Sequence, residues 1–151
     1  MSKHLMPRRQ QQGIALLEAM IATVILAIGL LGTIGLQARA YSAMNEASMR
    51  AEATIASEKL FGLMSTDVGN LPAYAMAAGG TPGTVLAKWV DEVKGSATNK
   101  GTVPGAVVSV AVAPLSGGTN STAVTVKISW TRKAGGPVNT NTMTSYLSGS
   151  R

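Results

Sequence analysis

An unbroken apolar stretch near the N-terminus constrains this chain more than any other feature of its sequence. It runs from Ile14 to Leu36, and residues 19–36 carry no charge. A helix of that length spans about 35 Å at roughly 1.5 Å per residue, which is enough to cross the hydrocarbon core of a bilayer. A soluble domain in a chain of 151 residues has no need of such a run. The sequence therefore predicts one transmembrane helix over residues 14–36, joined to a single small domain.

The charges that precede the stretch predict its orientation. Lys3, Arg8 and Arg9 lie within a basic leader that we expect to cover residues 1–13. By the positive-inside rule the N-terminus stays in the cytoplasm, and the bulk of the chain lies outside. A secretory signal peptide fits less well, because its apolar core has only about 7 to 15 residues and ends at a small-residue cleavage site. We therefore expect a single-pass membrane protein whose C-terminal part lies outside the cytoplasm.

Glu18 is the one carboxylate within the apolar stretch. Placing a carboxylate in a bilayer costs about 2.5 to 3.5 kcal/mol on insertion scales. A position near the headgroups would let the side chain reach water, whereas a deeper position requires a cationic partner. Because ionisable residues inside membrane helices are rare and usually functional, we interpret Glu18 as a residue that meets such a partner.

Gly13, the apolar run and Glu18 together resemble a type IV prepilin signal. The leader ends in RRQQQG, and IALLEAMIATVILAIGLLG follows, with glutamate at the fifth position after the glycine. The chain is similar to the type IV pilin-like family over roughly residues 8–40, and LLEAMIATVILAIGLLGTIGLQ most resembles the PilV-type minor pilins. One departure is Ile14, where the family most often has phenylalanine.

This resemblance implies a processing site and an assembly role. A prepilin peptidase is expected to cut between Gly13 and Ile14 and to methylate the new amine of Ile14. Glu18 is then expected to face the amino group of a neighbouring subunit. A buried carboxylate is tolerable beside a buried ammonium, and removing one partner costs about 3 to 5 kcal/mol. The implied partners are other major and minor pilins, the peptidase, the inner-membrane assembly platform and membrane lipid.

The helical pattern continues beyond the apolar stretch. Residues 37–65 contain no proline, and we expect them to form the amphipathic half of the same helix. Glu46 and Arg50 stand four residues apart in the favourable order for a helix ion pair. A stripe at helical spacing is expected to face the C-terminal domain: Met49, Ala53, Ala56, Leu60, Leu63 and Met64.

Residues 66–151 predict a headpiece with one short helix and three strands. A loop rich in glycine and proline follows the long helix, and a short amphipathic helix is expected over 84–94 with Trp89 in the core. The strands are predicted at about 106–113, 122–131 and 141–148, with Trp130 on the buried side of the second. The predicted fold class is α+β, the type IV pilin fold, in which the long N-terminal helix packs on a three-stranded antiparallel sheet.

The composition excludes most enzymes. The chain has no cysteine, its only histidine is His4, and it has seven carboxylates. No nucleophile–base pair and no cluster of metal ligands can be assembled, so we expect a non-enzymatic protein without metal or cofactor. Asp91 and Glu92 are adjacent and therefore point to different sides of a helix, which is typical of solvated surface.

The basic balance gives only weak grounds for nucleic-acid binding. The net charge of +6 falls to +3 without Lys3, Arg8 and Arg9, and the other cations are scattered. Arg132 and Lys133 lie together at a strand end, but no aromatic residue adjoins them. We therefore rank nucleic acid as a weakly supported partner.

Three functions remain open on the sequence. The first is a minor pilin of a type IV pilus, which contributes to pilus assembly or priming and hence to motility, adhesion or DNA uptake, and which moves from the inner membrane to the pilus. The second is a minor pseudopilin of a type II secretion system. The third is a single-pass periplasmic binding module, which would have little use for Gly13 before the apolar run or for Glu18.

Overall fold

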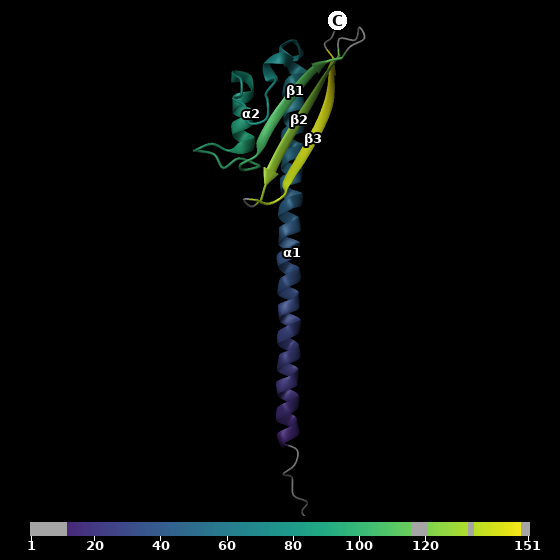
Figure 1. Ribbon diagram of the computed structural model, residues 1–151. Helices are drawn as coiled ribbons and strands as arrows, with labels where there is room; N and C mark the ends of the chain where they lie inside the picture. Colours follow the sequence, from purple (N-terminus) through teal and green to yellow (C-terminus); the bar gives the residue numbers. More distant parts are fainter. Residues whose placement is uncertain (1–11, 116–120, 133–134, 149–151) are drawn as a thin grey trace, which may run out of the picture. The chain divides into compact units, whose positions relative to one another are not determined.

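The computed structural model describes residues 12–115, 121–132 and 135–148. The chain divides into two compact units between Asn45 and Glu46, and the long helix contributes to both. The elements are labelled in Figure 1 and follow in the order α1 (Gln12–Thr66), the 3₁₀ helix η1 (Val68–Tyr74), α2 (Thr84–Lys94), β1 (Val107–Pro114), β2 (Ser121–Thr131) and β3 (Val138–Ser148).

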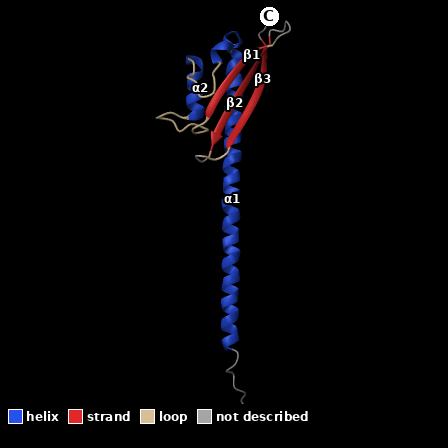
Figure 2. Cartoon of the chain, viewed as in Figure 1, coloured by secondary structure: helices blue, strands red, loops and turns tan. Residues whose placement is uncertain are grey.

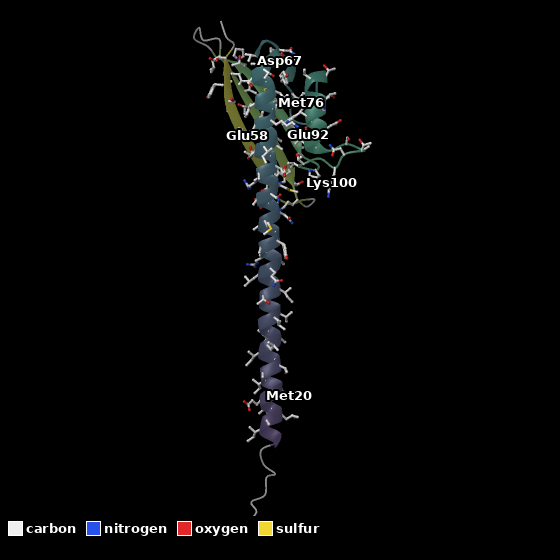
Figure 3. All side chains as sticks on the ribbon, turned by 180° about the vertical axis from the view of Figure 1, so that it is seen from behind. Met20, Glu58, Asp67, Met76, Glu92 and Lys100 are labelled. Atoms are coloured by element: carbon white, nitrogen blue, oxygen red, sulfur yellow. The ribbon has the colours of Figure 1, made fainter. Side chains whose placement is uncertain are left out.

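The first unit consists, in its described part, of α1 from Gln12 to Asn45. Its side chains from Gly13 onward are exposed, including all those of the apolar stretch. Gly29, Gly32 and Gly35 do not interrupt the helix. By length and composition α1 is able to cross a membrane, and it is the one such helix among the described residues. Figure 3 shows side chains such as that of Met20 standing out from the helix.

The second unit combines the rest of α1 with a sheet, as predicted. The three strands are antiparallel in the order β1-β2-β3, so each strand pairs with its neighbour in the chain. Figure 2 shows the sheet lying against the C-terminal part of α1, with α2 next to the same part of the helix. A long N-terminal helix and a three-stranded antiparallel sheet make an α+β arrangement that matches the type IV pilin fold.

Alternation along the strands places their aliphatic side chains in one core. Val108 and Val110 of β1 are buried, and Val110 pairs with Val126 of β2. Ile128 and Trp130 continue the same side of β2, as expected for a period of two residues. Trp130 is only 2% exposed, so the predicted phase of the second strand is correct.

The stripe on α1 covers this sheet, with one exception. Ala53, Ala56, Leu60 and Met64 are buried in the core, and Met49 packs partly against it. Leu63 is 47% exposed, so its predicted place in the stripe is wrong. A straight helix has 3.6 residues per turn, and a pattern repeated every seven residues therefore drifts by about 20° per heptad. Two heptads after Met49, that drift carries Leu63 to the rim.

Two buried side chains of the core donate hydrogen bonds to carbonyl groups of α1. Ser57 is fully buried, and its hydroxyl donates to the Ala53 carbonyl at 2.9 Å. The indole Nε1–H of Trp89, on α2, donates to the Ala56 carbonyl at 2.9 Å. Trp89 is therefore a core anchor, as predicted. The burial of Ser57 was not predicted from the sequence. The signal for it is helical spacing, because Ser57 stands four residues after Ala53 and three before Leu60, which are both buried.

The segment after α1 is more regular than the predicted loop. Val68–Tyr74 forms η1, and Leu71 and Tyr74 are both buried. Residues three apart lie on one side of a 3₁₀ helix, so this spacing places both side chains in the core. The hydroxyl of Tyr74 donates to Asp67 Oδ2 at 3.0 Å. Burial, and then this hydrogen bond, raise the pKa of Tyr74 above its ordinary value.

The third strand begins earlier than predicted. β3 starts at Val138 rather than at residue 141, and Val138 and Asn139 pair with Thr131 and Trp130. Asparagine disfavours strands, which hid this part of β3 in the sequence. Pairing with the full length of β2 outweighs that local preference. Residues 116–120, which join β1 to β2, lie outside the described residues.

Polar contacts join α1 to the adjoining ends of β2 and β3. Arg50 Nη2 donates to Glu46 Oε1 at 2.8 Å and to Asn139 Oδ1 at 3.4 Å. Arg132 Nη2 lies 3.7 Å from Glu46 Oε2. The hydrogen bond from Arg50, with the positive charges of Arg50 and Arg132, lowers the pKa of the Glu46 carboxyl.

We predict that a fragment starting at Ala38 folds cooperatively and that Trp130 dominates its stability. The buried hydrophobic residues among the described ones lie between Ala53 and Trp130, so the deleted part supplies no core. Trp130→Ala should lower the free energy of unfolding by about 3 to 5 kcal/mol. Tyr146→Ala is the control, because Tyr146 is 68% exposed. Equal melting midpoints for the two variants would contradict the core described above.

We predict an acid-sensitive contribution from Glu46. The pKa of Glu46 is lower in the folded chain than in the unfolded chain, where it is about 4.3. Its contribution to the free energy of unfolding is therefore present above about pH 4.3 and is lost as the pH falls through the folded pKa. The parent should therefore have a higher melting temperature than Glu46→Gln at neutral pH, and the difference in melting temperature should vanish near pH 3. Glu58→Gln, on the exposed side of the same helix, is the control. A difference that persists at pH 3 would contradict this account.

Candidate functional site

The predicted processing and assembly residues lie together at the start of α1. Ile14 and Glu18 are four residues apart, so their side chains share one face of the helix about one turn apart. Leu17, Ile21, Ala22 and Ile25 line a shallow groove together with these two residues. Glu18 is thus a single carboxylate on an exposed aliphatic surface.

The predicted scissile bond falls within the first turn of this helix. Gly13 follows Gln12, where α1 begins. A Cβ added at Gly13 would meet no described atom within 4 Å, and its backbone does not require glycine. The described fold therefore gives no reason of its own for a glycine at this position. A requirement for glycine here would have to come from another molecule.

The hydroxyl groups of the apolar stretch have partners within the helix. Thr23 Oγ1 donates to the Met20 carbonyl at 2.8 Å, and Thr33 Oγ1 donates to the Leu30 carbonyl at 2.8 Å. Such bonds remove the cost of placing a hydroxyl hydrogen in an apolar medium. Glu18 differs from both threonines, because its carboxylate brings a charge and has no hydrogen to donate.

The remaining polar residues of the sequence analysis take structural places. Glu92 forms an ion pair with Lys59 of α1 at 2.6 Å, and this contact joins α2 to α1. The Glu92 carboxylate is therefore paired with a lysine and does not form a carboxylate pair with Asp91. Arg132 lies beside Glu46, and Lys133 is outside the described residues. In the described part of the chain, no group of three or more His, Cys, Asp or Glu side chains is placed to hold a metal ion.

Exposure of the apolar stretch is the strongest functional signal of the first unit. Ile14, Leu16, Leu31 and Leu36 are each more than three-fifths exposed. Soluble domains rarely expose an apolar surface of this size, and those that do bind another protein or a membrane through it. The part of α1 within the second unit, by contrast, has its apolar side covered by the sheet. The described residues therefore leave the apolar surface of the first unit without a partner.

Comparison with known families places one signature on this region. Residues 8–34 match the prokaryotic N-terminal methylation motif, which spans the end of the leader and most of the apolar stretch. No curated protein and no solved structure matches the chain. The motif supports a type IV pilin-like prepilin, a structural subunit of the pilin or pseudopilin type. Together with the apolar helix it also supports membrane anchoring, processing by a prepilin peptidase and assembly with other pilins.

Proposed function

We propose that this protein is a minor pilin of a type IV pilus, a non-enzymatic subunit that helps to prime or assemble the fibre. The observation that carries the proposal is the methylation motif at the start of α1, where the apolar side chains of residues 14–36 are all exposed. The motif supports a prepilin-type subunit. The exposed apolar surface supports a role in which neighbouring subunits cover that surface. Through assembly the protein would contribute to motility, adhesion or DNA uptake.

The proposal gives the chain a defined path. The precursor enters the inner membrane with its N-terminus in the cytoplasm and its headpiece in the periplasm, as Lys3, Arg8 and Arg9 favour. The peptidase cuts after Gly13 and methylates Ile14, and residues 14–36 hold the subunit in the bilayer. The subunit then leaves the membrane for the fibre, where helices of other pilins replace lipid around it.

Glu18 has an assembly role in this proposal. After cleavage the new amine of Ile14 is the cation nearest to Glu18 in depth, either within one chain or between chains. Pairing between chains neutralises both charges where the dielectric is low, and it fixes the axial register of adjacent subunits. A single polar pair sets register in coiled coils in the same way.

We predict cleavage after Gly13. The mature protein should begin at methylated Ile14, which mass spectrometry of the N-terminus measures directly. Gly13→Val should leave uncleaved precursor in the membrane, because a branched side chain should not fit the peptidase at the scissile bond. The described fold itself places no atom within 4 Å of a Cβ at this position. Gly69→Val is the matched control, since a Cβ there also meets no described atom within 4 Å. A mature protein that begins at Met1, or a cut beyond Leu36, would overturn the proposal.

We predict that Glu18 is required for incorporation and not for insertion. Glu18→Ala and Glu18→Gln should reach the membrane and be cleaved, because each removes a charge that opposes insertion. Both should reduce the amount of this subunit in sheared fibres relative to its membrane level. Glu58→Gln, which removes an exposed carboxylate from the part of α1 in the second unit, is the control. Normal incorporation of both Glu18 variants would favour a simple membrane anchor.

The same fibres separate the minor pilin from its nearest alternative. Deleting the chain should lower surface pilus yield, and the subunit should be recovered in sheared pili. If the processed protein were absent from pili and its deletion impaired protein secretion, it would be a pseudopilin of a type II secretion system.

A further inference from the structure

Two pairs of residues in the first unit share one spacing. Ile14 and Glu18 lie four residues apart on α1, and so do Thr33 and Gln37. Each pair therefore lies on one helix face with a rise of about 6 Å. The second pair follows the first by nineteen residues. Two parallel helices staggered by nineteen residues would thus bring the first pair of one helix level with the second pair of the other.

The two pairs are chemically complementary. A cleaved and methylated Ile14 carries an ammonium that only donates hydrogen bonds, and the Glu18 carboxylate only accepts them. The Thr33 hydroxyl uses its hydrogen on the Leu30 carbonyl, so its oxygen is left to accept. The Gln37 amide offers two N–H donors. Thr33 thus suits the ammonium, and Gln37 suits the carboxylate.

The stagger also agrees with the thickness of a membrane. Nineteen residues of helix span about 28 Å, and the hydrocarbon core is about 30 Å thick. A subunit that has moved outward by this distance has just carried its charged end across the hydrocarbon. A neighbour that still spans the bilayer then presents Thr33 and Gln37 at that level.

We infer that Thr33 and Gln37 form a receiving site for the processed amino-terminal end of a neighbouring prepilin-type subunit. The occupant is defined by its chemistry, an α-ammonium with a carboxylate four residues later on an apolar helix. The inference rests on the proposed function, because both groups exist together only after cleavage. The site supplies hydrogen bonds to two charges where unpaired charges in an apolar medium are costly.

Opposite charges at position 37 test the site without knowledge of the neighbour's sequence. Gln37→Lys should be incorporated into sheared fibres at the parental level, because it attracts the arriving carboxylate. Gln37→Glu should fall roughly tenfold, since like charges in close apposition are strongly unfavourable. Ala38→Lys and Ala38→Glu are the matched controls, since Ala38 lies at the same depth about 100° around the helix. The measurement is the amount of subunit in fibres divided by its processed amount in membranes.

Two threonines provide a second arm. Thr33→Val should lower incorporation several-fold, whereas Thr23→Val should leave it unchanged. Thr23 makes the same hydroxyl–carbonyl bond at the same length, but Ala27 stands where a donor would be needed four residues later. Equal incorporation of the two valine variants would overturn the inference. So would equal incorporation of Gln37→Lys and Gln37→Glu, or the same split between the Ala38 variants.

The parent protein separates this inference from the proposed function. If the parent begins at methylated Ile14 and is recovered in fibres while the position 37 variants behave alike, the receiving site is wrong and the minor pilin stands. If the parent is uncleaved or absent from fibres, both are overturned.

Discussion

The structure depends on one constraint, the need to cover the apolar side chains of α1. The helix meets this constraint in two ways along its length. From Glu46 onward the chain covers its own helix, with the sheet and α2 burying Ala53, Leu60 and Met64. Between Ile14 and Leu36 the chain supplies no such cover among the described residues. In the proposed function, lipid meets the requirement in the membrane and the helices of other subunits meet it in the fibre, so the same surface would serve both states.

The two units differ in what their polar groups do. In the second unit, polar contacts join helices and strands to one another. Lys59 of α1 pairs with Glu92 of α2, and Arg50 of α1 donates to Asn139 of β3. In the first unit, the described polar groups lie on an exposed surface that no described residue covers. The hydroxyls of Thr23 and Thr33 use their hydrogens on the helix backbone, whereas the Glu18 carboxylate cannot. The proposed function therefore pairs this charge with a group of a neighbouring subunit.

Much of the fold could be predicted because its signals are periodic. The buried side of β2, ending at Trp130, follows from alternation alone, and α2 spans the residues expected from its amphipathic spacing. The errors came where tertiary packing outweighs local preference. η1 forms around Pro72 because Leu71 and Tyr74 enter the core, and β3 extends back to Val138 because β2 offers it a partner. Leu63 was misplaced because a seven-residue stripe drifts around a straight helix. The roles proposed for Gly13, Ile14 and Glu18 come from the resemblance to a prepilin signal, since one chain cannot reveal contacts made between chains.

The central claim is that residues 14–36 are covered by other subunits once the protein has left the membrane. Amide hydrogen exchange of this segment in sheared, lipid-free fibres tests the claim most directly. The account predicts exchange as slow as that of the core strand β2. Rapid exchange across residues 14–36 in fibres that contain the subunit would contradict it, because the apolar half of α1 would then lie outside the packed helices.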